Sequence, residues 1–392
     1  MPRTERALSH GLIFAAACAG MLLFGVVMIS LGTVNTFLAA SFSLNDATLG
    51  SLAALLPFGI LVGSLVFGPV VDRSGYRIPF IAAALMVGAG LETIAFSRSF
   101  GIIQASFFLI GCGGGILNGG TNALVADIST EAKGARLSLL GVFFGIGALG
   151  MPALIGLLLG SVSHDSIIAG IGAVVLLVSV VFGLIPFPAP KQPLGFPIRK
   201  GAALLRDGAL LLLAFVLFFE SGVESMVNNW TAMYLQRNVA ATSEAALLAL
   251  TVLAASLTVA RLLLGGLLKR FAPHRVVYAC LVCALSGGVV LLLATSTGIA
   301  RVGIVLLGIG FAPVFPVVLG YVGERYAALT GTAFSIALVI ALTGNMLLNG
   351  LVGVLAEAHG IDVFPTALVI CLFCILLVFW LALRRVRSST KT

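Results

Sequence analysis

Charged residues are scarce in this chain. Only 9% of its 392 residues are Asp, Glu, Lys or Arg, whereas 60% are hydrophobic. A soluble domain carries roughly 25% charged residues, because its surface must be solvated. Lipid is the solvent that suits this composition, since long apolar helices satisfy their own backbone hydrogen bonds. The sequence therefore predicts an all-α integral membrane protein in contact with the lipid bilayer.

The motifs of soluble enzymes are also missing. The sequence contains no H-E-x-x-H, nucleophile elbow or phosphate-binding loop. Its net charge of +8 forms no basic stripe with interleaved aromatic residues, so nucleic-acid binding is not predicted. The six cysteines lie in apolar runs, and neither C-x-x-C pair has a nearby His or carboxylate. We predict no enzymatic activity, no metal, no cofactor and no disulfide framework.

Twelve apolar segments are long enough to span a membrane, which takes about 20 residues. The first six are predicted at 11–40, 48–71, 78–97, 102–126, 138–161 and 166–187. The second six are predicted at 207–235, 244–268, 276–296, 299–322, 331–354 and 363–384. The longest polar connection, 188–206, then links a six-helix bundle of residues 1–187 to another of residues 207–392.

The basic residues predict the orientation of these spans. With both termini in the cytoplasm, all but four of the 22 Lys and Arg residues lie on cytoplasmic segments. Arg98, Arg237 and Arg301 lie on the opposite side, and Arg261 lies within the eighth span. This asymmetry follows the positive-inside rule. We expect a multi-pass, monomeric protein of the cell inner membrane.

The two halves also resemble each other. Gly68 matches Gly266 across the loops after the second and eighth spans, and Asp127 matches Glu324 after the fourth and tenth. Two repeated halves with a solute site between them are a known transporter plan.

The loop sequence G-P-V-V-D-R-S-G-Y-R at 68–77 resembles the signature of the major facilitator superfamily, G-x-x-x-D-R-x-G-R-R. Its position between the second and third spans is also that of the superfamily loop. The resemblance implies the major facilitator fold, with twelve helices in two pseudo-symmetric bundles of six.

Four further stretches resemble the fucose/galactose/glucose:proton symporter branch of that superfamily. They are 220–235, 308–316, 260–265, and 122–127 together with 139–152. In that branch, G-x-E is followed six residues later by Trp, and Glu224 and Trp230 take these positions. The branch tends to carry acids in its first and fourth helices, where this chain has Asn35, Asn118 and Asn122.

Two acids lie within the seventh predicted span. Glu220 and Glu224 are four residues apart and therefore share a helix face. An ionisable group inside a bilayer is costly and is by default a functional candidate. We predict that Glu224 and Glu220 carry the coupling proton; the alternative is a polar contact between helices. Arg261 would be stabilised by snorkelling or by pairing with one of these acids.

Charged residues also gather after the second, fourth and tenth spans. The predicted cytoplasmic gate consists of Asp72, Arg73, Arg77, Asp127, Glu131, Arg136 and Glu324. Salt bridges among them would break as the carrier opens inward. The alternative is a set of solvated helix ends, since exposed ion pairs are individually weak.

Asparagines within the spans suggest the solute. The predicted binding residues are Asn35, Asn118, Asn122, Asn228, Trp230, Asn345 and Asn349. Amides donate and accept hydrogen bonds, which suits a polyhydroxylated solute, and Trp230 offers a stacking surface. The alternative is that these amides join helices to one another.

We therefore expect a secondary active transporter that moves a small polar solute, such as a sugar, together with protons by alternating access. One alternative is a proton-driven exporter of amphiphilic compounds, since G-A-L-G-M-P-A-L-I-G at 147–156 loosely resembles the antiporter motif. The other is a nutrient sensor without transport activity.

Overall fold

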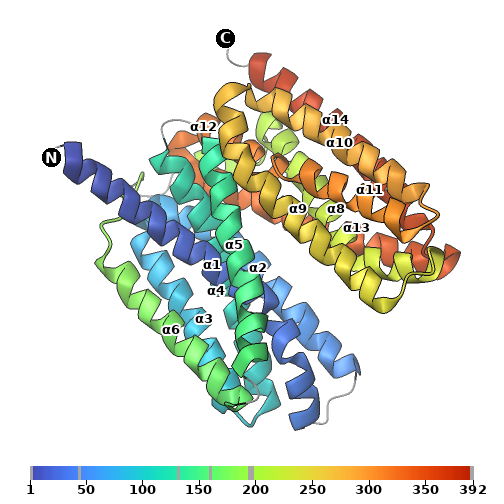
Figure 1. The fold of residues 1–392 in the computed structure, drawn as a ribbon. Coiled ribbons are helices and arrows are strands. Elements are labelled where there is room, and N and C mark those ends of the chain that lie inside the picture. Colours follow the sequence, from blue (N-terminus) through green and yellow to red (C-terminus); the bar gives the residue numbers. More distant parts are fainter. Residues whose placement is uncertain (1–2, 43–45, 130–132, 159–160, 193–197, 389–392) are drawn as a thin grey trace. The chain divides into compact units, whose positions relative to one another are not determined.

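The computed structural model describes residues 3–42, 46–129, 133–158, 161–192 and 198–388 (Figure 1). The regular secondary structure in these ranges is helical, with no strand. Twelve segments of the described residues are helices long and apolar enough to cross a membrane. The predicted number of spans and the all-α class are thus confirmed.

The first six spans lie in six separate helices. These are α1 (Arg3–Phe42), α2 (Asp46–Ser74), α3 (Arg77–Phe96), α4 (Phe100–Ile128), α5 (Lys133–Leu158) and α6 (His164–Leu184). A short helix, α7 (Ile198–Leu204), lies within the polar connection.

The second six spans use more elements. They are formed by α8 (Gly208–Asn238), α9 (Ser243–Arg270), α10 (Pro273–Leu292), α11 (Thr297–Phe311), α12 (Val314–Arg325), η1 (Ala327–Leu329), α13 (Thr330–His359) and α14 (Val363–Ser388). The tenth span is divided into α11 and α12 next to Pro313, whose nitrogen cannot donate a helix hydrogen bond.

The helices form two compact units. The first comprises residues 1–128, 140–201 and 326–335, and the second comprises 129–139, 202–325 and 336–392. Each unit therefore includes one short segment from the other half of the sequence. The division predicted from the sequence, with bundles 1–187 and 207–392 joined by 188–206, stays a prediction.

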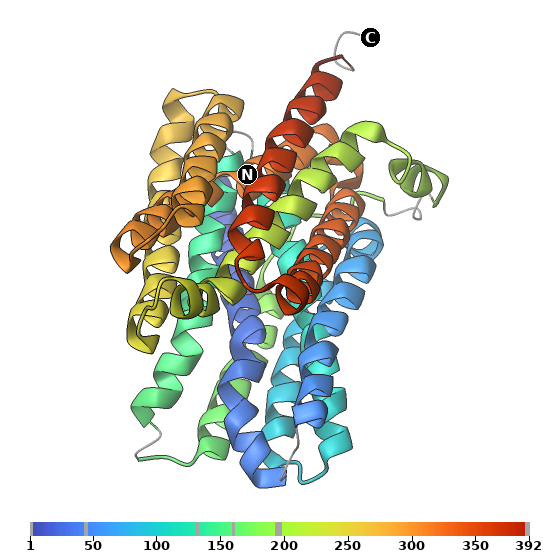
Figure 2. The same ribbon diagram turned by 90° about the vertical axis from the view of Figure 1, so that its right-hand side faces the viewer.

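Glycine permits the close packing of α2 and α4 in the first unit, where the two helices lie side by side (Figure 2). A Cβ on Gly59 or Gly63 would overlap the carbonyl oxygen of Phe108 or Cys112 on α4, respectively. Small residues let membrane helices approach until their backbones touch. This contact fixes α4, which carries Asn118 and Asn122.

Candidate functional site

The membrane-spanning helix α8 contains two acids, Glu220 and Glu224. Asp207 begins this helix by accepting hydrogen bonds from the backbone nitrogens of Ala209 and Leu210. Glu220, three turns further on, is 1% exposed. By distance and angle, neither of its carboxylate oxygens is hydrogen-bonded among the described residues, and the Glu224 carboxyl lies close enough to interact with it. Burying a carboxyl group that lacks a hydrogen bond costs free energy, so packing alone does not explain an acid at position 220.

Arg261 of α9 faces the same acids. Its Nη2 lies 4.0 Å from Oε2 of Glu224, and the side chains are 13% and 28% exposed. A charge on Glu220 is attracted by Arg261 and repelled by Glu224. Charges in a bilayer occur mainly where they pair with one another or line a polar cavity. The second unit therefore contains two carboxylates that share one guanidinium.

Amides join α8 to α13 one turn beyond this cluster. Asn229 Nδ2 donates to Asn349 Oδ1 at 3.1 Å, and Asn349 Nδ2 donates to the carbonyl oxygen of Asn345 at 2.8 Å. Asn228 donates to the carbonyl oxygen of Glu224 at 2.8 Å, and its side chain is exposed. The structure thus brings Asn349 into direct contact with α8 through Asn229.

Two more polar side chains of α8 lack partners in the described part of the chain. Trp230 packs its ring near Gly353 of α13, where a Cβ would lie 3.4 Å from the ring, and its Nε1 atom is buried and unbonded. The hydroxyl group of Thr231 is also buried without a partner. Polar atoms left in this way are available to a ligand or a water molecule.

Asn118 and Asn122 lie on one face of α4 in the first unit. Asn122 Nδ2 donates to the carbonyl oxygen of Asn118 at 2.8 Å and to its Oδ1 at 3.3 Å. Both residues are buried. Asn35 lies in α1, but its side chain is outside the described part of the structure.

Asp72 caps the first turn of α13. Its carboxylate accepts hydrogen bonds from the backbone nitrogens of Gly331 and Thr332, at 3.1 and 2.8 Å, and from Thr332 Oγ1 at 2.6 Å. All of these residues belong to the first unit. A helix N-terminus carries unsatisfied N–H groups and a positive dipole end, so a buried carboxylate is stabilised there.

Asp127 is held by two donors. Lys191 Nζ lies 2.6 Å from its Oδ1, and Tyr76 Oη lies 2.5 Å from its Oδ2. Burial and the adjacent Asp127 carboxylate raise the pKa of Tyr76 well above its ordinary value, so this hydroxyl keeps its proton and donates. Lys191 also donates to the Ala327 carbonyl oxygen and to Thr330 Oγ1, at 2.6 and 2.7 Å. The linker lysine thus connects α4 to the segment that begins α13.

The sequence profile of the Major Facilitator Superfamily matches residues 12–341 and, in a second match, 213–392. The chain belongs to the major facilitator superfamily. Its family and fold are those of membrane transporters rather than enzymes, as the sequence predicts. The loop at 68–77, which resembles the superfamily signature, supplies Asp72 and Tyr76 to the contacts above.

The chain is similar to FucP, the fucose:proton symporter of E. coli, whose outward conformation superposes with a TM-score of 0.80. The sequences are 20% identical over 96% of this chain and 99% of FucP, which shows the shared fold.

Two curated relatives match shorter stretches. Sodium-dependent glucose transporter 1 of Danio rerio is 25% identical over 211 residues, or 53% of this chain and 35% of that protein. Multidrug resistance protein MdtH of Salmonella arizonae is 31% identical over 139 residues, or 34% and 33% of the two chains. The chain therefore spans about a third of the length of each of these relatives.

The remaining residues of the predicted cytoplasmic gate are not brought together in the described part of the chain. Arg73, Arg136 and Glu324 are exposed and form no ion pair among the described residues. Arg77 donates to the carbonyl oxygen of Gly183 instead. Glu131 lies outside the described residues.

Several site residues were not predicted from the sequence. Lys191 and Tyr76 were missed because neither the polar linker nor the loop has a helical periodicity that would indicate a partner. Asn229 lies in the same span as Asn228, and it is the bond from Asn229 to Asn349 that distinguishes the two amides. Thr332 was missed because its role depends on an acid far away in the sequence.

Proposed function

We propose that this chain is a secondary active transporter that couples a small polar solute, in the first instance a sugar, to protons by symport. The observation that carries the proposal is the pair Glu220 and Glu224 beside Arg261 inside the membrane-spanning part of the second unit. The likeness to FucP supports the fold on which such a mechanism operates.

The charges of this cluster suit a proton carrier. The cluster contains one guanidinium, that of Arg261, and two carboxyl groups. The charge of Arg261 compensates the charge of one carboxylate, so the other carboxyl group is neutral only when it holds a proton. Burial favours the neutral assembly, since each uncompensated charge in a bilayer is costly. Proton binding and release at Glu224 or Glu220 would therefore change the stability of one conformation relative to another.

The candidate solute ligands are the amides and the indole. Asn228, Trp230, Asn345 and Asn349 lie in the second unit near the acids, and Asn35, Asn118 and Asn122 lie in the first. The unbonded polar atoms of Trp230 and Thr231 support a site that gains hydrogen bonds when a hydroxylated solute enters.

Two sets of contacts with the start of α13 support a conformational lock: those of Asp72, and those of Lys191, which also binds Asp127. A transporter alternates between states, and a few kcal/mol of differential contact is enough to shift such an equilibrium. We propose that these contacts stabilise the outward-open state and break during transport. Arg73, Arg77, Arg136 and Glu324 stay secondary candidates for this gate.

The proposal includes the membrane and the topology. We infer a cell inner-membrane location, cytoplasmic termini and a monomer, with bundles 1–187 and 207–392. Reporter fusions at each terminus that are active only in the cytoplasm, together with the mass of the purified protein, test these statements.

Proton coupling is tested in de-energised vesicles that contain the purified chain. Sugars and polyols are added singly while external pH is recorded. We expect alkalinisation with at least one solute, its loss in Glu224→Gln, and its retention in the control Glu92→Gln, which changes an intramembrane acid of α3. No pH change with any solute, in the presence of folded protein, would refute sugar–proton symport.

A second candidate function is proton-driven export of amphiphilic compounds. The relative MdtH and the G-A-L-G-M-P-A-L-I-G sequence at 147–156 favour it. A strain that lacks the gene would then become sensitive to dyes or antibiotics, whereas a symporter deletion would lose growth on one carbon source. Solute binding without flux would instead indicate a sensor.

A further inference from the structure

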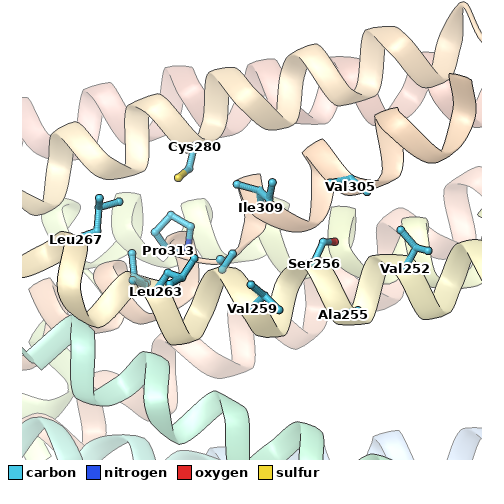
Figure 3. A pocket seen from close by; sticks show the side chains of 13 residues that line it. Val252, Ala255, Ser256, Val259, Leu263, Leu267, Cys280, Val305, Ile309 and Pro313 are labelled. Atoms are coloured by element: carbon cyan, nitrogen blue, oxygen red, sulfur yellow. The ribbon is translucent and has the colours of Figure 1, made fainter.

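An apolar pocket of about 600 Å³ lies in the second unit among α9, α10 and α11 (Figure 3). Its wall includes Val259, Leu263, Cys280 and Ile309. Ser256 also lines the pocket, but its hydroxyl already donates to the carbonyl oxygen of Leu253 at 2.9 Å. A polar solute needs several convergent polar groups, so this pocket suits a hydrocarbon chain.

Comparison with the first unit explains why the space is there. Gly111 of α4 meets the backbone of Leu56 and Gly59 on α2, and Gly308 of α11 meets Leu253 and Ser256 on α9. Ser256 therefore occupies the position of Gly59. These contacts define a register, that is, an alignment of the first half of the chain with the second. It is shifted by one residue from the alignment that matches the loop glycines Gly68 and Gly266.

The same register places Ala260 where the first unit has Gly63, and Ala312 where it has Gly115. Ser256, Ala260 and Ala312 all line the pocket. In the first unit, the matching glycines allow α2 and α4 to touch through their backbones. In the second unit, the side chains of Ser256, Ala260 and Ala312, together with Pro313, keep the helices apart and leave the pocket between them.

The pocket opens on the face of α9 that is turned away from α5. Gly265 and Leu268 of α9 lie against the first turns of α5, which belong to the second unit. Leu263 and Val259, on the opposite face, are 69% and 54% exposed. Leucine and valine exposed within a membrane span contact lipid, so a lipid chain has access to the pocket.

The end of the pocket near Leu267 is strongly basic. Lys269 and Arg270 end α9, and Arg275 lies in the first turn of α10. All three are exposed and form no ion pair with any described residue. The sequence contains no Asp or Glu between residues 245 and 292, so α10 and all but the first turn of α9 carry no acid.

We propose that this surface binds an anionic phospholipid. One acyl chain occupies the pocket between α9 and α10, and the phosphate headgroup lies against Lys269, Arg270 and Arg275. Basic clusters beside gaps between membrane helices have the chemistry that recognises anionic headgroups. The inference is independent of the transported solute, since it uses none of the residues assigned to solute or proton.

The test uses the full-length chain, delipidated in detergent and titrated with phosphatidylglycerol or phosphatidylcholine of identical acyl chains. Native mass spectrometry measures the dissociation constant of the first bound lipid. Each basic side chain contributes roughly fivefold to anionic lipid binding. We expect phosphatidylglycerol to bind at least about tenfold more tightly than phosphatidylcholine.

Two variants locate the site. Replacing Lys269, Arg270 and Arg275 together with Gln should abolish the preference for phosphatidylglycerol. Ala255→Phe, which fills the pocket but keeps the charges, should weaken phosphatidylglycerol binding at least about fivefold, a loss of the size of one basic contact. The control with Arg384 and Arg385 changed to Gln, at the end of α14, should retain the preference.

Equal affinity for the two lipids in the unmodified chain would overturn the proposal. So would a preference that survives in the triple Gln variant, or phosphatidylglycerol binding that Ala255→Phe leaves unchanged. Circular dichroism and monodisperse elution confirm that each variant is folded before the affinities are compared.

Discussion

The ion pair between Lys191 and Asp127 offers a quantitative test of the linker contact. Lys191 Nζ and Asp127 Oδ1 are 2.6 Å apart, with side chains 27% and 10% exposed. The chain also contains a matched exposed pair, Arg98 and Asp165, 3.6 Å apart with side chains 76% and 30% exposed. The two pairs differ in burial and distance, which are the properties that set the strength of an ion pair.

Coulomb's law gives the scale of the difference. At 2.6 Å and an effective dielectric constant of about 20, the Lys191–Asp127 attraction is about 6 kcal/mol. Desolvation and about 2 kcal/mol of lost lysine rotamer entropy oppose it, which leaves a coupling of about 2 kcal/mol. The Arg98–Asp165 pair lies largely in water, where exposed pairs contribute about 0.2–1 kcal/mol.

Double-mutant cycles measure these couplings directly. Lys191→Met and Asp127→Asn are made singly and together, as are Arg98→Met and Asp165→Asn, and unfolding is followed in mixed micelles. We expect the first coupling to exceed the second by at least about 1 kcal/mol. Equal couplings would show that the linker lysine does not hold α4 to the start of α13.

Three further outcomes follow from the packing. Gly63→Leu should destabilise the chain by about 3 kcal/mol, because the new Cβ would overlap the backbone of α4. The control Gly170→Leu has open space around it and should not destabilise the chain, so equal unfolding midpoints for the two variants would contradict this prediction. Asp72→Ala should lower the free energy of unfolding by about 3 kcal/mol, since two buried N–H groups at the start of α13 lose their acceptor. Asp72→Asn should lower it less, and the reverse order would argue against the helix cap. Pro316 lies in the first turn of α12, directly after the break next to Pro313. If this region is a hinge, Pro316→Ala should slow transport more than it lowers stability, and a parallel loss of both would count against the hinge.

The sequence predicts those features that depend on composition and local periodicity. Long apolar runs define twelve spans because a bilayer requires each backbone group to be bonded within its own helix. The spacing of four residues between Asn118 and Asn122 places them on one face of α4, and their hydrogen bond shows that it does. The break between α11 and α12 lies next to Pro313, which is a local cause of the same kind.

Contacts between distant segments are not predictable in this way. Lys191 lies in a polar, proline-rich connection, where nothing in the sequence selects Asp127 or Thr330 as its partner. Glu324 lies at a helix end as Asp127 does, but it is exposed and forms no ion pair with any described residue. A sequence locates charges at helix ends, whereas folding decides which of them meet.

The two halves repeat a backbone plan with different chemistry at matched positions. In the register defined by Gly59 and Ser256, Ser64 corresponds to Arg261, the partner of Glu224. Asp72, which caps α13, corresponds to Lys269, at the basic end of the pocket. A repeat can duplicate helix positions, but each side chain is selected separately. At these two matched positions the halves differ in charge. Arg261 pairs with Glu224 and Asp72 caps α13, whereas Lys269 belongs to the proposed lipid site.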